Sequence, residues 1–397
     1  MNLLRLSFLL IACTTGLGIA GTDLILPAIP GLPAALGGDT ARAQYVLASY
    51  AAGTGIGLIL FGELGARMDQ RLVLIISLGL FAACSLAATF AVNMDMLIAL
   101  RLLQGVLGAA APALAPGLVR ALYPPDQAIG ALGIIASIES LVPALAPAAG
   151  YWLILQSDWR ASFWALCLLG AILTAALMAS IRHLPKVRLS SSRLTYASLW
   201  FNRIYLRYAL SQACSLGALL IFVFGAPAVI TGPMGGSLAD FITMQISGIV
   251  CFIISANLVG RLVARLGHER VIWMGSSLMA ASALFIVIFA LMDSRQMIVL
   301  AVLFVPMNLG LGLRGPPGFF QALVSAGEND ARGGAMVIVL VLALVALGTA
   351  LVAPWIIIGP LPLALTSFAA ASLSLLFLHA LPGKNHNNGD GPIAVHG

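Results

Sequence analysis

The chain has 397 residues, of which 61% are hydrophobic and only 9% are charged. Soluble domains carry about 25% charged residues, so this composition excludes water as the main solvent and predicts a polytopic membrane protein. The net charge of +6 does not indicate a nucleic-acid partner, because the basic residues are spread over short loops and form no stripe. The expected surroundings are a lipid bilayer.

Long apolar runs separated by short polar breaks predict about twelve transmembrane helices, since each span needs about 20 apolar residues. The runs of the first half are 6–26, 44–64, 72–92, 96–118, 129–153 and 161–181. Those of the second half are 206–230, 241–263, 271–291, 297–323, 335–357 and 361–381. The predicted fold class is an all-α polytopic membrane protein with two six-helix halves.

One polar stretch, residues 182–203, interrupts the apolar pattern at the middle of the chain. It predicts a cytoplasmic linker between an N-terminal half at 1–181 and a C-terminal half at 204–381, with a cytoplasmic tail at 382–397. In the second predicted helix, Gly53, Gly55 and Gly57 indicate close packing against a neighbouring helix.

The distribution of Lys and Arg predicts the orientation, because positively charged loops stay in the cytoplasm. If the N-terminus is inside, most of the 20 Lys and Arg residues fall on the cytoplasmic side, and only Arg42, Arg160 and Arg295 fall outside. We therefore expect a multi-pass protein of a bacterial inner membrane with both termini in the cytoplasm.

A short pattern after the second predicted helix recurs after the eighth, about half the chain later. Gly62, Leu64, Ala66 and Arg67 correspond to Gly260, Leu262, Ala264 and Arg265. Repeated halves with a binding site at their seam near the midplane are typical of secondary transporters. The repeat predicts that architecture here.

Four charged residues, Asp23, Arg101, Glu139 and Arg314, stand out within the predicted spans. A charge there costs about 2.5 to 3.5 kcal/mol and is seldom kept without a role. Asp23 and Arg101 are expected at a similar depth in the outer third of the membrane, so their positions allow an ion pair.

Glu139 is expected close to the midplane among apolar neighbours, where a carboxylate is poorly solvated and readily takes up a proton. A structural alternative is a carboxyl held neutral, or bonded to a Ser or to the backbone. Arg314 precedes Pro316 and Pro317, which are expected to interrupt the backbone hydrogen-bond ladder of their helix and leave carbonyls facing a cavity. Arg314 has three readings: it binds an anion, pairs with an acid, or snorkels to the cytoplasmic surface.

Several kinds of chemistry have no pattern in this sequence. There is no phosphate-binding Gly-Lys-Ser/Thr loop, and no His cluster within a predicted span. We therefore expect no enzyme activity, no metal and no cofactor. Energy is expected to come from an ion gradient, such as the proton gradient, or from the gradient of the solute itself.

Five segments of the first half carry a family resemblance: Thr22–Pro30 (TDLILPAIP), residues 57–71, Arg101–Gly105, Pro143–Gly150 and Trp159–Phe163. They resemble motifs of the major facilitator superfamily, and more narrowly of its twelve-helix drug/proton antiporters of the bicyclomycin-resistance type. The similarity is dense over the first half of the chain and thin over the second.

The resemblance implies roles for matching residues. Asp23 would gate protons and cationic or neutral drugs, with Arg101 as its partner in proton coupling. The segment with Pro143, Pro147 and Gly150 would form a helix bend that limits leakage.

The resemblance also implies a conformational latch between the halves, formed by Gly62 and Arg67 and, through the repeat, by Gly260 and Arg265. The loop departs from the family pattern, because Ala66 stands where the family has Asp, and Asp69 and Gln70 replace Gly and Arg. The charge-dependent part of the latch is therefore expected to differ.

Together these patterns predict a monomeric secondary active transporter that exports a small hydrophobic or amphipathic compound, a drug or a metabolite, in exchange for protons by alternating access. One alternative is a metabolite or siderophore exporter or importer of the same fold. Another is a membrane-embedded enzyme or a non-transporting membrane sensor.

Overall fold

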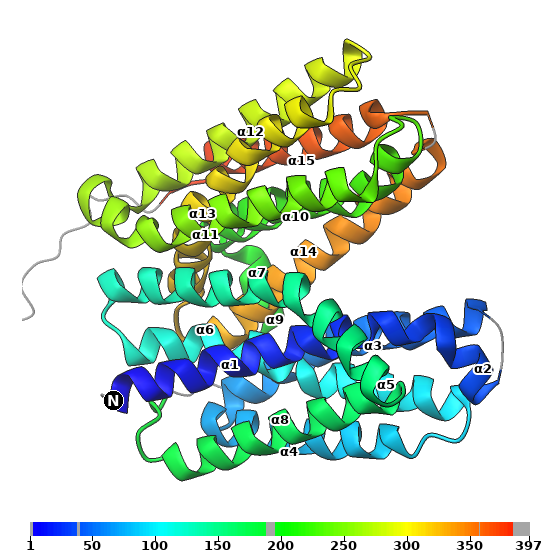
Figure 1. Ribbon diagram of the computed structural model, residues 1–397. Helices are drawn as coiled ribbons and strands as arrows, with labels where there is room; N and C mark the ends of the chain where they lie inside the picture. Colours follow the sequence, from blue (N-terminus) through cyan, green and yellow to red (C-terminus); the bar gives the residue numbers. More distant parts are fainter. Residues whose placement is uncertain (1–2, 38–39, 188–194, 357, 384–397) are drawn as a thin grey trace, which may run out of the picture.

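The computed structural model describes residues 3–37, 40–187, 195–356 and 358–383 (Figure 1). Helices make up nearly all of these residues, and none of them lies in a β-strand. Parts of the predicted linker and most of the predicted tail, at 188–194 and 384–397, lie outside the described residues.

Twelve helical segments of the described chain are long and apolar enough to cross a membrane, which confirms the predicted number. The first six comprise α1 (Leu3–Asp23), α3 (Thr40–Arg67), α4 (Gln70–Thr89), α5 (Met94–Gly108) with α6 (Ala110–Leu122), α7 (Pro125–Gln156) and α8 (Arg160–Ser180). The second six are α10 (Arg203–Thr231), α11 (Leu238–Leu266), α12 (His268–Leu291), α13 (Met297–Ala326), α14 (Asp330–Val352) and α15 (Pro360–Ala380). A short helix, α9 (Tyr196–Phe201), precedes α10.

The first span differs from its prediction, because α1 ends at Asp23 and a 3₁₀ helix, η1 (Leu26–Gly31), and a short helix, α2 (Leu32–Leu36), follow it. Pro27 lacks the N–H that would continue the α-helical ladder and disfavours a helical conformation at the residue before it. The amide of Ile25 bonds to the carbonyl of Thr22, so the last turn is tightened. As a result, carbonyl groups at the end of α1 are left for side-chain donors.

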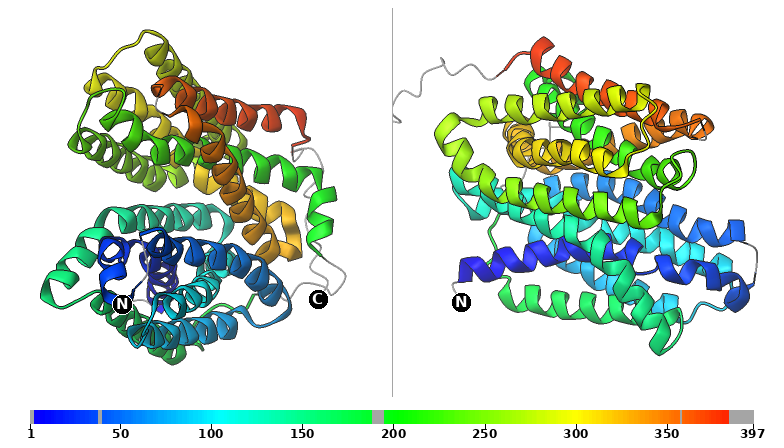
Figure 2. Two further views of the ribbon diagram at one scale, coloured as in Figure 1. Left: turned by 90° about the vertical axis from the view of Figure 1, so that its right-hand side faces the viewer. Right: turned by 45° about the horizontal axis from the view of Figure 1, so that its top comes forward.

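The helices form two groups, α1–α8 and α10–α15, drawn as the lower and upper parts of Figure 1. The groups touch mainly along two helix pairs, α3 with α14 and α7 with α11, and further where α6 meets α14 and α7 meets α13. α3 and α11 carry the repeated sequence pattern, so each copy of the repeat lies on a helix that contacts the other group. The two further views in Figure 2 show the same division.

Because successive spans alternate in direction, the bundle has two distinct faces. Among the described residues, the terminal face carries the start of α1, the end of α15 and the connections at 68–69, 123–124, 181–187, 195–202, 267 and 327–329. The opposite face carries the described connections at 24–37, 90–93, 157–159, 232–237, 292–296, 353–356 and 358–359.

Close packing of α3 on α5 depends on two of the three glycines noted in the sequence. A Cβ at Gly53 would overlap the backbone of Leu102, and one at Gly57 would overlap the backbone of Val106. Gly55 lies on another side of α3 and faces open space. The packing prediction is thus confirmed for Gly53 and Gly57 and wrong for Gly55.

These glycines allow a matched stability test. We expect Gly53→Ala to destabilise the fold by about 1–3 kcal/mol, because backbone atoms cannot move aside for the new methyl group. Gly55→Ala should be neutral or slightly stabilising, because Ala is the better helix former and meets nothing. Thermal unfolding of both variants in detergent measures the difference, and equal melting temperatures would contradict the packing described here.

Candidate functional site

Arg101 is fully buried on α5 and binds the end of α1. Its Nη1 donates to the carbonyl of Gly21 at 2.8 Å and to Gln104 Oε1 at 2.6 Å, while Nε donates to the carbonyl of Val46 at 3.3 Å. The guanidinium carbon lies 4.1 Å from the centre of the Tyr50 ring. Since a positive charge is favourable at the C-terminal end of a helix, Arg101 caps α1.

Asp23 is the last residue of α1 and is partly exposed. Asp23 lies two residues beyond Gly21, whose carbonyl accepts from Arg101. The charges of Asp23 and Arg101 are both close enough to Tyr50 to interact electrostatically with its side chain. Among the described residues, Asp23 and Arg101 nevertheless form no ion pair. The donors of Arg101 are directed at backbone carbonyls and Gln104, and its Nη2 has no partner. The structure therefore brings the two residues to one helix end without joining them.

Two further helices hold the end of α1. The Ser162 hydroxyl of α8 donates to the carbonyl of Leu24 at 3.2 Å. Gly150 of α7 lies so close to the same carbonyl that a Cβ would overlap it. The sequence motifs containing Arg101, Gly150 and Ser162 thus converge on the point where α1 stops.

Glu139 lies on α7 and is partly exposed. Its carboxyl is within hydrogen-bonding reach of the Thr15 hydroxyl on α1. That hydroxyl also donates to the carbonyl of Ala12 at 2.9 Å, so its single proton cannot fully serve an ionised Glu139 as well. No Lys or Arg among the described residues forms an ion pair with Glu139.

The surroundings of Glu139 link it to the helix break and to the other helix group. Pro143, four residues later, lacks the N–H that would bond the Glu139 carbonyl, although α7 runs through Pro143 and Pro147 as one helix. Two residues earlier, the Ser137 hydroxyl accepts a hydrogen bond from Asn257 of α11 at 2.8 Å. Glu139 therefore lies on the helix through which the two groups meet.

Arg314 is fully buried inside the C-terminal group. Its Nη1 donates to the carbonyl of Ser211 at 2.9 Å and its Nη2 to the Ser211 hydroxyl at 3.1 Å, while Nε has no partner. The snorkelling reading is therefore wrong, and Arg314 pairs with no described acid. α13 nevertheless continues through Pro316 and Pro317, although neither proline has an N–H to donate to the helical ladder. Prolines remove two ladder hydrogen bonds without ending this helix, since neighbouring helices support it on several sides.

The four charged residues do not gather in one place. Asp23 and Arg101 share the end of α1, Glu139 lies between α1 and the α7–α11 contact, and Arg314 packs against α10 and α12. The structure thus brings Asp23 and Arg101 to the same helix end but places Arg314 in a separate polar cluster.

An ion pair that sequence reasoning missed joins the two groups at the terminal face. Arg332, at the start of α14, is 1% exposed, and its Nε and Nη2 donate to the Glu63 carboxylate of α3 at 2.5 and 2.9 Å. Glu63 also pairs with Arg67, whose side chain is 66% exposed. Glu63 lies three residues before Ala66 on the same helix face, so an acid is present one turn from the position where the family has Asp.

The repeated glycines both lie where the groups touch. A side chain at Gly62 would overlap the Tyr196 hydroxyl and press on Ala335 of α14. A Cβ at Gly260 of α11 would lie 3.4 Å from Gly130 of α7. Arg265, in contrast, is exposed and forms no ion pair with a described residue.

Asp69, which stands where the family has Gly, belongs to an anchor within the first group. Arg71 pairs with Asp69 at 2.6 Å and donates to the carbonyl of Ile181 at the end of α8, and its guanidinium holds the pKa of Asp69 below the usual range. In the second group, Arg207 likewise pairs with Glu269 and donates to the Leu381 carbonyl at the end of α15. In each group, the Arg of an Arg–acid pair thus binds a carbonyl at the C-terminal end of the last helix.

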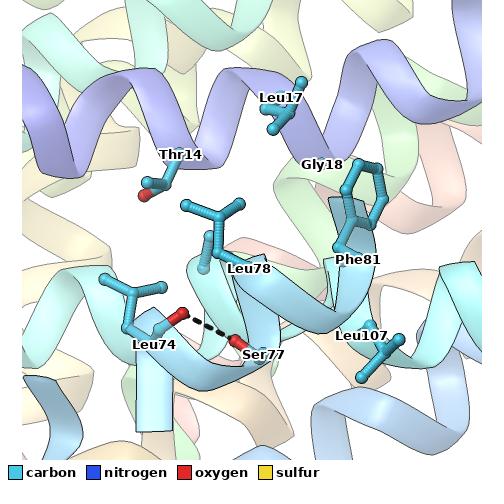
Figure 3. Close-up of a pocket in the computed structure, with 10 residues that line it drawn as sticks. Thr14, Leu17, Gly18, Leu74, Ser77, Leu78, Phe81 and Leu107 are labelled. Atoms are coloured by element: carbon cyan, nitrogen blue, oxygen red, sulfur yellow. Dashed lines mark hydrogen bonds between the residues drawn. The ribbon is translucent and has the colours of Figure 1, made fainter. Parts of the chain in front are cut away.

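A small pocket lies within the first group, between α1, α4 and the α5–α6 segment (Figure 3). Its lining is mostly apolar, and its hydroxyl groups are already bonded, Thr14 to the Ile11 carbonyl and Ser77 to the Leu74 carbonyl. It has room for about one water molecule, so it is a packing gap and no substrate site.

Twelve spans in two groups, related by a sequence repeat and in contact mainly through α3 with α14 and α7 with α11, form an architecture typical of two-domain membrane transporters. The sequence profile of the Major Facilitator Superfamily matches residues 11–339, and the chain belongs to this family. The chain is therefore a multi-pass membrane protein of this transporter family.

Its relatives include drug-resistance proteins of bacteria. The chain is 27% identical to the chloramphenicol resistance protein of Pseudomonas aeruginosa, over 68% of this chain and 64% of that protein. It is 25% identical to the bicyclomycin resistance protein homolog of Haemophilus influenzae, over 69% of this chain and 70% of that protein. The chain thus spans less than two thirds of the first of these relatives.

Two solved structures share the fold. The proton:xylose symporter XylE, bound to 6-bromo-6-deoxy-D-glucose, has a TM-score of 0.69 at 16% identity, covering 94% of this chain and 96% of XylE. The transporter FucP in its outward conformation also has a TM-score of 0.69 at 16% identity, covering 94% of this chain and 97% of FucP. These likenesses confirm the predicted architecture.

Proposed function

We propose that this protein exports a small hydrophobic or amphipathic compound from the cytoplasm in exchange for protons, as a monomer in the bacterial inner membrane. The terminal face is the cytoplasmic face in this proposal, as the positions of Lys and Arg predict. The names of the relatives, which refer to chloramphenicol, bicyclomycin and multidrug resistance, support an efflux role.

The observation that carries the proposal is the environment of Glu139. A carboxyl that has no basic partner among the described residues, and whose neighbouring hydroxyl already donates to a backbone carbonyl, is costly when ionised. Its place next to the α7–α11 contact makes its charge sensitive to how the two groups are arranged. Proton binding and alternation between two arrangements are then coupled.

The contacts between the groups support a conformation closed toward the cytoplasm. Glu63 with Arg332, Ser137 with Asn257, and Gly260 with Gly130 all lie in the halves of their helices nearer to the terminal face. In the exchange cycle, protonation of Asp23 or Glu139 from outside favours opening of the terminal face, where the proton leaves and the compound binds.

Proton-driven flux in proteoliposomes tests this proposal. We expect Glu139→Gln to lower flux driven by an imposed pH gradient at least about tenfold, equivalent to about 1.4 kcal/mol of coupling. Asp23→Asn should also lose the response to the gradient. The matched control is Asp293→Asn, the same chemical change at an exposed loop of the opposite face, which should transport like the wild type.

The outcomes separate the hypotheses. Wild-type flux that ignores the proton gradient rejects antiport, and flux only in the inward direction favours an importer. No flux for a panel of hydrophobic, amphipathic and siderophore compounds favours a non-transporting sensor.

A further inference from the structure

The short helix α9 contacts both helix groups at the terminal face. On one side, the Tyr196 hydroxyl donates to the Ile59 carbonyl of α3 at 2.7 Å. On the other, Asn329, which immediately precedes α14, donates to the Thr195 carbonyl at 3.2 Å and to the Ser198 hydroxyl at 3.5 Å. A single helical turn of the segment between the groups is therefore bonded to each of them.

These contacts continue into the ion pair between the groups. Asn329 Oδ1 accepts from Arg332 Nη1 at 2.8 Å, and Arg332 in turn binds the Glu63 carboxylate. Glu63 lies one turn after Ile59 on α3, where the bond from Tyr196 ends. We call this set of bonded residues the clasp ring. It consists of Ile59, Glu63, Arg332, Asn329 and the turn Thr195–Ser198, and its bonds begin at Ile59 and return to Glu63, both on α3.

We propose that α9 is a clasp that holds the terminal face closed, with Tyr196 as the positioning residue that keeps Glu63 and Arg332 together. The inference rests on the proposed alternation of this face but assigns the closing element to a segment outside the spans. Glycine at position 62 is part of the arrangement, because any side chain there would displace the Tyr196 hydroxyl.

The packing of α9 indicates which bond opens. Leu199 is 2% exposed within a core cluster of the C-terminal group that includes Tyr205 and Ala326, so α9 stays with that group. Among the described residues, the bond from Tyr196 is the hydrogen bond that joins α9 to the N-terminal group. Burial raises the pKa of Tyr196 to about 12, so the hydroxyl remains a donor throughout the physiological pH range.

Distances between spin labels test the clasp without any substrate. The five native cysteines, all free, are replaced by Ala or Ser, and labels are placed at Met68→Cys and Arg270→Cys, exposed positions of opposite groups at the terminal face. We expect Tyr196→Phe to raise the ratio of open to closed populations about fivefold, as the loss of one hydrogen bond predicts. Tyr45→Phe, at an exposed tyrosine elsewhere on α3, is the matched control and should leave the ratio unchanged.

A second variant and three possible results decide whether the clasp exists. Tyr196→Ala, with its melting temperature measured alongside, should shift the ratio at least as far as Tyr196→Phe. Wild-type protein that populates both distances, with ratios unchanged in both variants, overturns the clasp and leaves alternating access intact. A single distance under every condition, in wild type and variants, rejects the alternation itself. A shifted ratio in a protein without proton-dependent flux keeps the clasp and removes only antiport.

Discussion

Glu63→Gln should abolish most transport, because it leaves the buried guanidinium of Arg332 without its carboxylate. Breaking a buried ion pair costs about 3–5 kcal/mol, and the lower end applies here, since the Glu63 side chain is 31% exposed. The population closed at the terminal face should fall about hundredfold, and flux should fall at least about tenfold. Spin-label distances across the terminal face and proteoliposome flux measure the two effects.

A comparison with Arg67 sharpens this prediction. Arg67 is the residue that the family resemblance assigns to the latch, yet its exposed pair with Glu63 should be worth only about 0–1 kcal/mol. Arg67→Gln should therefore change flux about fivefold at most. In a double-mutant cycle, Glu63→Gln with Arg332→Gln should be less harmful than the sum of the single changes. Strictly additive effects would show that the pair does not act as the latch.

Arg101→Lys should destabilise the protein and stop transport although it keeps the positive charge. The single ammonium group of Lys cannot replace the forked guanidinium that donates to Gly21, Gln104 and Val46. Each buried acceptor that loses its donor costs about 1–3 kcal/mol of folding free energy. The melting temperature in detergent should fall by at least about 5 °C. The freed end of α1 should carry Asp23 away from Arg101.

Arg160→Lys is the matched control for Arg101. Arg160 also donates to a carbonyl at the end of a helix, that of Thr89 on α4, but its side chain is 39% exposed, so water can replace it. Its melting temperature and flux should stay close to those of the wild type. If both Lys variants behave alike, the end of α1 is not held by Arg101 in the way described.

Sequence patterns predicted several parts of the site for physical reasons that act locally. Charged residues in apolar runs are conspicuous because lipid cannot solvate them, so Asp23, Arg101 and Glu139 were found without a structure. Gly62 and Gly260 were found because the repeat marks equivalent helix ends. The roles of all these residues in transport stay predictions.

Glu63 and Arg332 escaped sequence analysis because each lies close to a helix end, where a charge is ordinary. The two residues are 269 positions apart, and only packing of α3 on α14 brings them together. The same holds for Tyr196, an unremarkable linker residue until α9 lies against Gly62. Arg314 was misjudged for a related reason, since its distance from a helix end says nothing of the helices that cover it.

The amino-acid sequence alone determined that this protein is a bundle of twelve membrane helices, because the transfer of apolar residues and backbone groups into lipid depends on each segment separately. It also marked the helix ends and the ionisable groups within the spans. The tertiary structure decided which carbonyls Arg101 binds, that Arg314 is enclosed, and that Glu63, Arg332 and α9 join the two groups. Contacts between distant segments depend on the angle and register of packed helices, which no single segment specifies.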